Sequence, residues 1–166
     1  MTVLVTGATG FLGGRLAEVL KERGERVRLL VRREGALDGR GYEVARGCLE
    51  DRDSLRRAVE GAHIVYHCAG LASDWAPWSE FLAVNVTGVR NLVDAAAEAG
   101  CVQRFVHVST TDVYGYPRRP CDESYGFHDV GLPYNRSKGL GEQEVWRVHR
   151  QIGLPVTVVR PASIYG

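Results

Sequence analysis

Residues 2–14 read TVLVTGATGFLGG, and this opening stretch decides the fold that the sequence predicts. A short run of β-branched and apolar residues ends at Gly7, glycines follow at Gly10 and Gly13, and the residues beyond have apolar side chains at helical spacing. The pattern predicts a strand, a tight turn and a helix. Backbone N–H groups of such a turn can approach a pyrophosphate at the helix N-terminus, where the helix dipole favours an anion. The stretch therefore predicts a dinucleotide-binding turn, against the alternative that the glycines serve an ordinary turn.

The alternation of strand and helix continues along the chain. Strands are predicted within residues 26–32, 42–47, 63–70, 104–110 and 155–160, and helices within 11–24, 51–61, 79–100 and 134–153. Strands that are apolar throughout and alternate with helices form parallel sheets with right-handed crossovers and helices on both faces. We therefore predict one α/β domain over residues 1–166, a doubly wound Rossmann fold with strand order 3-2-1-4-5-6.

The composition favours a globular protein with a small-molecule partner. With 166 residues, of which 45% are hydrophobic and 25% charged, the chain can bury one sizeable core. Its 21 basic and 20 acidic residues give a net charge of +1, which argues against a nucleic acid or an anionic membrane as the main partner. The first residues lack the pattern of a signal peptide, and no apolar run reaches the ~18 residues of a membrane span. We therefore predict a soluble, cytoplasmic protein.

The cysteines and histidines show no spacing typical of metal ligands. Cys48, Cys68, Cys101 and Cys121 lie at least twenty residues apart without a CxxC pair, which is typical of small buried side chains in a reducing compartment. The five histidines are also scattered, so no metal site is predicted.

The residues after the second predicted strand bear on the choice of dinucleotide. An acidic residue about 20 residues beyond the glycine turn would hold the ribose 2′-hydroxyl of NAD, but this chain has Arg32 and Arg33 there. Two guanidinium groups favour a 2′-phosphate, so NADP is the predicted cofactor, with NAD as the alternative. In that alternative both arginines face solvent and Glu34 reaches a ribose hydroxyl.

A tyrosine and a lysine four residues apart form the candidate catalytic pair. All but two of the 21 basic residues are arginine, and Lys138 is one of the two lysines, which suggests a chemical requirement for an ammonium group. Tyr134 lies one helical turn before it, and a nearby ammonium favours the phenolate form of a tyrosine. A hydroxyl from Ser109, Thr110 or Thr111, just past the fifth strand, could hydrogen-bond the substrate oxygen. The alternative is an exposed tyrosine beside a solvated lysine.

Two further stretches lie near this pair. Residues 110–133 form a long irregular segment, and such loops in compact domains are usually functional. Residues 71–81, LASDWAPWSEF, concentrate Trp75, Trp78 and Phe81 after the fourth strand. These aromatic side chains either form the rim of a substrate pocket or cover the sheet edge and the start of a helix.

Six motifs together resemble a known family over the whole chain. The segments TGATGFLG (6–13), HCAG (67–70), NVTGVRNL (85–92), STTDVYG (109–115), YNRSK (134–138) and RPASIYG (160–166) are similar to those of extended short-chain dehydrogenases/reductases of the NAD(P)-dependent epimerase/dehydratase group. The chain resembles the N-terminal, cofactor-binding part of such a protein.

The resemblance implies a role for each motif. It implies that Tyr134 is the catalytic acid/base and that Lys138 lowers its pKa and holds the nicotinamide ribose. It further implies that Thr110, preceded by Ser109, orients the substrate hydroxyl or ketone. The cofactor-binding residues expected from the motifs and from the strand ends are Gly7, Thr9, Gly10, Phe11, Leu12, Gly13, Arg32, Arg33, Cys48, Leu49, Cys68, Ala69, Gly70, Asn85, Tyr134, Lys138 and Pro161.

The chain departs from the family pattern at three places. Gly47-Cys48-Leu49 stands where many members have Gly-Asp-Leu, which removes one expected adenine hydrogen bond. Thr111-Asp112 stands where the related dehydratases have Asp-Glu, so epimerisation or simple reduction is expected rather than dehydration. The motif RPASIYG resembles the crossing into the substrate domain, which is therefore expected to be largely absent from these residues.

The expected function is hydride transfer between NADP(H) or NAD(H) and a carbonyl or secondary alcohol. The protein would be an epimerase or a reductase of a sugar-nucleotide or hydroxysteroid-like substrate. A non-catalytic dinucleotide-binding sensor and an inert cofactor-domain fragment are the alternatives, and the complete set of Tyr134, Lys138 and Thr110 argues against a sensor. Homodimer formation through the helices around Asn85 and Tyr134, as in many family members, is left open.

Overall fold

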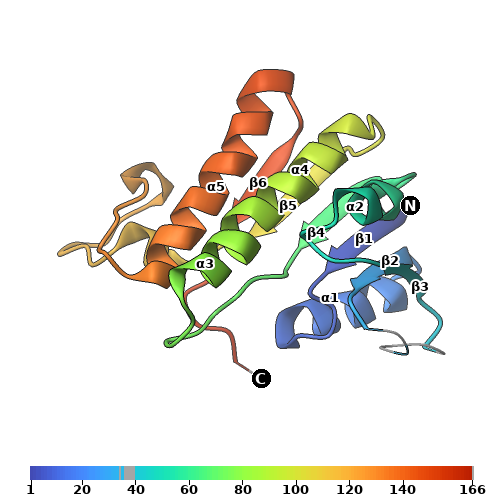
Figure 1. Cartoon of the computed structure of the whole chain (residues 1–166), viewed down its shortest axis with the longest axis horizontal. Coiled ribbons are helices and arrows are strands. Elements are labelled where there is room, and N and C mark those ends of the chain that lie inside the picture. The colour runs from blue at the N-terminus through green and yellow to red at the C-terminus, as the bar shows by residue number, and fades with distance from the viewer. Residues whose placement is uncertain (34, 36–39, 166) are drawn as a thin grey trace.

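Six parallel strands form the centre of the computed structural model, which describes residues 1–33, 35 and 40–165 (Figure 1). The strands are β1 (Thr2–Thr6), β2 (Arg26–Val31), β3 (Glu43–Arg46), β4 (Ile64–His67), β5 (Arg104–Val108) and β6 (Val156–Val159). Their order across the sheet is β3-β2-β1-β4-β5-β6, and all neighbouring pairs are parallel. The predicted doubly wound sheet and its strand order are confirmed.

The helices alternate with these strands as the sequence indicates. The α-helices are α1 (Phe11–Glu22), α2 (Arg52–Val59), α3 (Trp78–Phe81), α4 (Gly88–Glu98) and α5 (Pro133–Ile152), with a π-helical stretch η1 (Leu82–Thr87) and 3₁₀ turns η2 (Thr111–Tyr114) and η3 (Glu123–Tyr125). α2 begins after Asp51, whose side chain accepts hydrogen bonds from two amides of the first turn. α5 begins with Pro133 and ends at Gly153, which has a left-handed conformation.

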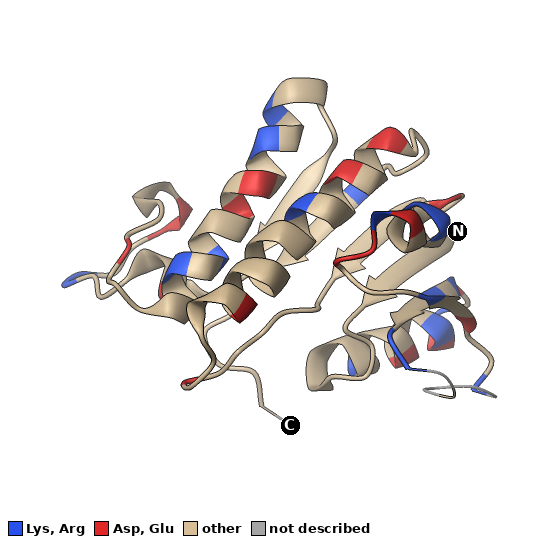
Figure 2. Cartoon of the chain, in the orientation of Figure 1, with Lys and Arg blue, Asp and Glu red and all other residues tan. Residues whose placement is uncertain are grey.

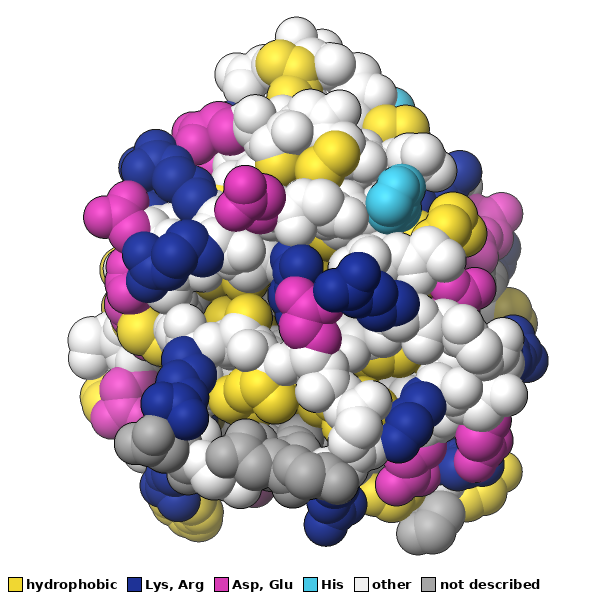
Figure 3. All heavy atoms as spheres, turned by 90° about the vertical axis from the view of Figure 1, so that its right-hand side faces the viewer, with side chains coloured by type: hydrophobic (Ala, Val, Ile, Leu, Met, Phe, Trp, Pro, Cys, Tyr) yellow, Lys and Arg dark blue, Asp and Glu magenta, His cyan; other side chains and the backbone are white. Residues whose placement is uncertain are grey.

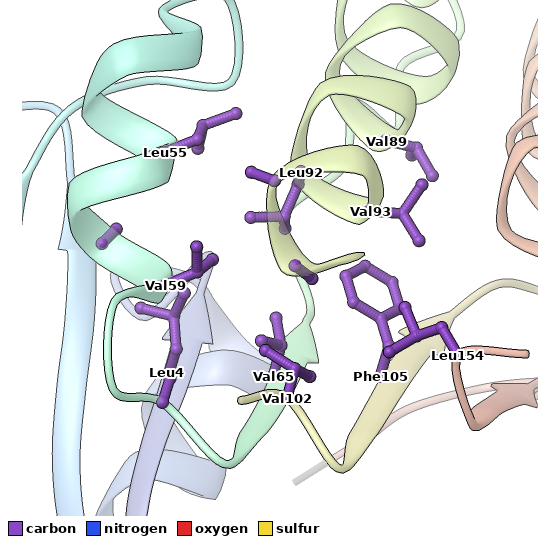
Figure 4. Close-up of a cluster of buried hydrophobic side chains, with 14 of the residues drawn as sticks. Leu4, Leu55, Val59, Val65, Val89, Leu92, Val93, Val102, Phe105 and Leu154 are labelled. Carbon is purple, nitrogen blue, oxygen red and sulfur yellow. The ribbon is translucent and has the colours of Figure 1, made fainter. Parts of the chain in front are cut away.

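Alternate residues of β1 face two separate apolar clusters, one on each side of the sheet. Leu4 lies in the larger cluster with Leu55 of α2 and Phe105 of β5 (Figure 4). Val5 lies in the second cluster with Ala17 of α1. This is the two-residue period of a strand, and burial on both faces explains why β1 is apolar at successive positions.

Helices cover the two faces of the sheet unequally. α2, α4 and α5 lie side by side over one face (Figure 1), whereas α1 packs against β1 and β2 on the other. On that second face Thr157 of β6 is exposed, and Val159 is 44% exposed. Helices therefore lie on both faces, as predicted, and the second face of β6 is exposed in the described chain.

The helix predicted over residues 79–100 consists of three segments. α3 continues directly into η1 and then into α4. A π-helical turn contains an extra residue compared with an α-helix, and such turns frequently occur at functional sites. Here η1 contains the buried Asn85, whose carbonyl oxygen lies so close to α5 that a Cβ on Gly141 would be 2.3 Å from it.

The surface carries interspersed charges (Figures 2 and 3). Ion pairs join neighbouring helices: Arg147 of α5 lies 2.6 Å from Asp94 of α4, and Arg56 of α2 lies 3.1 Å from Glu98 of α4. The face in Figure 3 mixes basic and acidic side chains, in agreement with the net charge of +1. In the described ranges, no helix has the length and apolar character needed to cross a bilayer.

Gly7 and Gly13 allow close backbone contacts at the first turn. Gly7 has a positive φ of 71°, and a Cβ there would lie 2.7 Å from the amide nitrogen of Ala69, just after β4. A Cβ on Gly13 would lie 2.4 Å from the Gly7 carbonyl oxygen. Gly10 is less restricted, because a Cβ there would lie 3.2 Å from the same oxygen and its φ is −90°.

Gly13→Ala should destabilise the protein, because the added methyl group would overlap the Gly7 carbonyl in a backbone contact. Overpacking of this kind costs about 1–3 kcal/mol in the free energy of unfolding. Gly10→Ala is the matched comparison and should cost less. Urea unfolding followed by circular dichroism measures both variants. A Gly13→Ala variant as stable as the wild type would contradict the close contact.

Candidate cofactor cleft and active site

A cleft of about 280 Å³ lies at the carboxyl ends of β1, β2 and β4. The strand order reverses between β1 and β4, and open α/β sheets bind ligands at this point. The residues that line the cleft are Thr6, Gly7, Thr9, Gly10, Leu30, Val31, Arg32, Gly47, Cys48, Leu49, Glu50, Cys68, Ala69, Gly70, Leu71 and Val84.

The N-terminus of α1 at this cleft suits an anionic group. Gly10 is the N-cap residue, has an extended backbone and supplies no capping side chain to the first amides of the helix. The first turn also has no acidic residue that would repel an anion. Amides without a capping side chain and the helix dipole together fit the pyrophosphate of a dinucleotide. The residues present therefore fit a nicotinamide dinucleotide.

Most of the predicted cofactor residues lie around this one cleft. Those that line it are Gly7, Thr9, Gly10, Arg32, Cys48, Leu49, Cys68, Ala69 and Gly70. Phe11 and Leu12 instead line a neighbouring open cavity of about 840 Å³ beside α1. Gly13 is buried beneath the turn, and Pro161 lies away from the cleft with its carbonyl accepting a hydrogen bond from the Thr111 amide at 3.1 Å.

The two arginines after β2 differ in position. Both are exposed, but Arg32 lines the cleft and Arg33 lies outside the lining. Glu34, the alternative contact to a ribose hydroxyl, lies outside the described residues. Arg32 is therefore the guanidinium that borders the cleft.

A second pocket, of about 250 Å³, lies at the first turn of α5 and contains Tyr134. Its lining residues are Ser73, Asp74, Ala76, Phe81, Asp112, Tyr116, Val130, Leu132, Pro133, Tyr134 and Asn135. The Phe81 ring lies 6.5 Å from the Tyr134 ring, centroid to centroid. Trp75 and Trp78 are outside the lining, and the Arg136 guanidinium lies over Trp78 at 5.5 Å. Of the aromatic stretch after β4, Phe81 forms the pocket wall.

Lys138 is buried between the two cavities. It is 5% exposed, and its Nζ donates a hydrogen bond to the Val108 carbonyl at the end of β5, at 2.7 Å. A Cβ on Gly70, which lines the cofactor cleft, would lie 3.7 Å from the same Nζ. Burial lowers the pKa of Lys138 from 10.5 to about 8, and the charges of Glu142 and Cys68 oppose that shift.

Tyr134 keeps its proton more tightly than a free tyrosine. Burial raises the pKa of Tyr134, the Asp112 carboxylate raises it further, and hydrogen bonding with Thr110 lowers it. The expected effect of Lys138 on the pKa of Tyr134 stays a prediction. The Lys138 ammonium donates its hydrogen bond to the Val108 carbonyl.

Of the hydroxyl groups after β5, that of Thr110 is the one that interacts with Tyr134. Its Oγ1 accepts a hydrogen bond from the Asp112 amide at 3.2 Å, and its interaction with Tyr134 lowers the pKa of that phenol. Ser109 is 4% exposed, and its hydroxyl finds no partner among the described residues. Thr110 is therefore the hydroxyl that interacts with Tyr134, whereas the Ser109 side chain is buried.

Asn85 lies behind the site and holds two of its walls together. Its Nδ2 donates to the Leu71 carbonyl at 2.9 Å and to the Ser137 hydroxyl at 3.0 Å, and its Oδ1 accepts from the Leu71 amide at 2.8 Å. It is 2% exposed and does not line the cofactor cleft. Asn85 thus ties the segment after β4 to α5.

A buried ion pair between Glu142 and Arg160, which the sequence analysis missed, places a negative charge near Lys138. Glu142, 3% exposed, lies one turn after Lys138 and accepts hydrogen bonds from Arg160 at 2.9 and 2.6 Å. Arg160 also donates to the Tyr114 hydroxyl at 3.0 Å, so the pair joins the end of β6 to α5 and η2. The sequence signal was the repeated four-residue spacing, which puts Tyr134, Lys138 and Glu142 on one helix face.

Two buried histidines, for which the sequence indicated no role, lie near Lys138. The rings of His67 and His107 are 5.3 Å apart, and His67 Nδ1 hydrogen-bonds with the Thr6 hydroxyl at 2.7 Å. Burial, and then the charge of Lys138, lowers the pKa of His67 to about 3 and that of His107 well below 6.5. Both rings stay neutral at physiological pH and add no positive charge beside the ammonium.

The arrangement can exchange a proton in one cavity and hold a cofactor in the other. The Tyr134 pocket holds the phenol and Asp112, and Lys138 connects it to the cofactor cleft. Within the described ranges, no group of three or more His, Cys, Asp or Glu side chains could hold a metal ion. The geometry suits acid/base chemistry on an oxygen beside a bound dinucleotide.

Comparison with known proteins gives matches along the whole chain. A family model described as the NAD dependent epimerase/dehydratase family matches residues 3–166. Sterol demethylase protein B of Methylococcus capsulatus is 42% identical over 100% of this chain and 52% of its own length. The 4-hydroxy-2-methyl-3-oxo-4-farnesyl-3,4-dihydroquinoline-1-oxide ketoreductase of Stigmatella aurantiaca is 37% identical over 100% of this chain and 51% of its own length.

A solved structure gives the same result. A short-chain dehydrogenase/reductase superfamily protein from Agrobacterium tumefaciens, crystallised with bound NAD, matches with a TM-score of 0.85 and 35% identity, over 96% of this chain and 48% of its own. The chain thus spans about half the length of the relatives it matches.

The neutral histidines predict a pH dependence of stability. The folded protein keeps His67 neutral down to about pH 3, whereas the unfolded chain binds a proton below about pH 6.5. The stability that each neutral histidine contributes is therefore fully present above pH 6.5 and is lost as the pH falls below that value. The free energy of unfolding should fall by up to about 1.4 kcal/mol per pH unit for each histidine.

Urea unfolding of the wild type and of His107→Leu between pH 8 and 5 tests this dependence. Replacing one titrating ring should flatten the loss of stability below pH 6.5, because His107 then no longer binds a proton on unfolding. The same slope in both proteins would show that the ring is charged in the folded state or accessible to protons there.

Proposed function

Since the chain belongs to the NAD-dependent epimerase/dehydratase family, we propose that it is the cofactor-binding part of an oxidoreductase that interconverts a carbonyl group and a secondary alcohol. The position of Lys138 carries this proposal. It lies one turn from Tyr134 on α5, and its ammonium borders the cofactor cleft at Gly70. Because the chain spans about half the length of its relatives, the proposal concerns the activity of the whole protein.

A nicotinamide dinucleotide, when bound, supplies or takes up the hydride. The first amides of α1 would hold its pyrophosphate, and Lys138 would hold the nicotinamide ribose. Cys48, which lines the cleft, stands where many family members have an aspartate. Its thiol would replace the carboxylate that accepts a hydrogen bond from adenine in those proteins. Arg32 at the cleft supports NADP as the preferred cofactor, and the NAD bound to the Agrobacterium protein supports NAD as the alternative.

Tyr134 would exchange a proton with the substrate oxygen. Its raised pKa keeps the hydroxyl protonated at neutral pH, which suits donation to a carbonyl oxygen that is gaining negative charge. The Thr110 hydroxyl, hydrogen-bonded to Tyr134, would orient the same oxygen. Lys138 would stabilise the phenolate that remains after donation. These roles favour the reduction of a ketone.

Epimerisation is the second candidate, supported by the description of the family, and a sugar nucleotide is the substrate expected for it. Reduction is favoured by the relative named as a ketoreductase. Dehydration is disfavoured because Asp112 is the single carboxylate directly after the hydroxyl segment. A cofactor sensor or an inert fragment would bind the dinucleotide without turnover.

The free cysteines support a cytoplasmic location as part of this proposal. A homodimer formed through the helices around Asn85 and Tyr134 stays a prediction.

Tyr134→Phe should abolish turnover and spare cofactor binding, because it removes the proton donor and keeps the ring. We expect kcat/KM for a ketone substrate to fall by at least about 10²-fold, with the affinity for NADPH changed by less than about twofold. Stopped assays of NADPH oxidation and fluorescence titration measure the two quantities. Tyr125→Phe, a loss of the same hydroxyl from a ring stacked on His128, is the control. Turnover unchanged by Tyr134→Phe would refute the catalytic role.

Arg32→Gln should weaken the binding of NADPH, since it removes the guanidinium at the cleft. Loss of a charge-assisted phosphate contact corresponds to about 10-fold to 100-fold in Kd, with little effect on NADH. Arg33→Gln is the matched control, because Arg33 lies outside the lining. Equal binding of NADPH and NADH by the wild type would show that Arg32 does not hold a 2′-phosphate, and the ribose contact would then have to be assigned to another residue.

A further inference from the structure

We propose that the Tyr134 pocket selects uncharged carbonyl substrates, and that Asp112 is the residue that disfavours a substrate whose carboxylate is separated by one carbon from its reacting carbonyl. This inference rests on the proposed function and specifies its substrate class. It starts from the charges in the pocket wall.

The wall of the Tyr134 pocket contains two carboxylates and no basic side chain. Asp74 and Asp112 contribute the carboxylates, while the described lining includes neither lysine nor arginine. The remaining wall is largely apolar or aromatic, with the side chains of Ala76, Phe81, Tyr116, Val130, Leu132 and Pro133. Such a wall suits a neutral, largely apolar body around the reacting carbonyl.

Asp112 is held in place from two elements. Its amide donates to the Thr110 hydroxyl at 3.2 Å, and its carbonyl accepts a hydrogen bond from Asn135 Nδ2. Thr110 and Asn135 are 6% and 2% exposed, so both clamps are buried. Because Asn135 is the residue after Tyr134 on α5, these bonds fix the backbone of Asp112 relative to the phenol, and its exposed side chain lines the pocket.

The negative charges of the pocket are not neutralised by neighbouring arginines. Arg136, next in sequence to the pocket residues of α5, pairs with Asp129 at 3.3 Å and lies over Trp78. Among the ion pairs of the described residues, none involves Asp112 or Asp74. The field of Asp112 also reaches the reacting group, because its charge raises the pKa of Tyr134.

A substrate that places its carbonyl oxygen at Tyr134 therefore brings neighbouring groups close to Asp112. A hydroxyl, an ester or an alkyl group meets no electrostatic penalty there. A carboxylate a few ångströms from Asp112 meets like-charge repulsion that, in a partly hydrated pocket, corresponds to about a tenfold loss of affinity.

The test compares two ketones of nearly equal shape and different charge, acetoacetate and methyl acetoacetate. With NADPH and NADH in turn, kcat/KM is measured for the wild type, for Asp112→Asn and for Asp53→Asn. Asp53 is the control because its carboxylate lies on α2, away from the pocket, and pairs with Arg56 at 3.1 Å. We expect the wild type and Asp53→Asn to favour the ester by about tenfold, and Asp112→Asn to favour it by less than about threefold.

A binding measurement separates failure of this inference from failure of the proposed function. Trp75 and Trp78 lie beside the segment that lines the pocket, so quenching of tryptophan fluorescence reports on occupancy without turnover. If neither ketone is reduced, the function fails, but a preference for the ester that Asp112→Asn removes still supports the selectivity. Equal affinity for acid and ester, a preference that persists in Asp112→Asn, or no binding of either ketone would overturn it.

Discussion

The burial of one ammonium group constrains the packing around the site. Lys138 is almost completely removed from water, and a buried ammonium is costly unless it is hydrogen-bonded and its charge is balanced. The Val108 carbonyl provides the hydrogen bond and Glu142 the opposing charge. Glu142 is in turn held by Arg160. Through these contacts the end of β5, the helix α5 and the end of β6 are fixed relative to one another.

Close contacts between small residues bring the two cavities together. Gly7 allows the first turn to lie against the segment after β4, and Gly70 in that segment, which lines the cofactor cleft, lies close to the buried Lys138 ammonium. Gly141 allows α5 to lie against the π-helical turn at Asn85. A single ammonium can therefore border the cofactor cleft and still lie one helical turn from Tyr134, which is the condition for coupling a cofactor to an acid/base group.

The two cavities differ in the charged groups on their walls. The cofactor cleft has Arg32 and Glu50 on its wall together with the uncapped amides of α1, and the guanidinium and the amides suit phosphate groups. The Tyr134 pocket has Asp112 and Asp74 and no basic residue among its described lining. A net charge near zero does not show which charged groups surround either cavity, so the overall composition indicates a small-molecule partner without indicating its charge.

The sequence by itself determined the order of the strands and helices, the glycine turn and the spacing of Tyr134 and Lys138. These features depend on local periodicity and on residues a few positions apart, so they can be read without knowing what packs against them. For the same reason it led to residues that line one cleft, because they follow the ends of neighbouring strands. The motif spacing also led to Thr110, which the structure brings to Tyr134.

Only the tertiary structure decided which groups are buried and what they contact. The raised pKa of Tyr134, the neutral pair of His67 and His107 and the ion pair of Glu142 with Arg160 all depend on burial or on partners far apart in the chain. The open β6 edge likewise depends on which helices pack where, and not on the pattern of β6 itself. Periodicity specifies the elements, whereas desolvation and the distances between charges arise when those elements pack together.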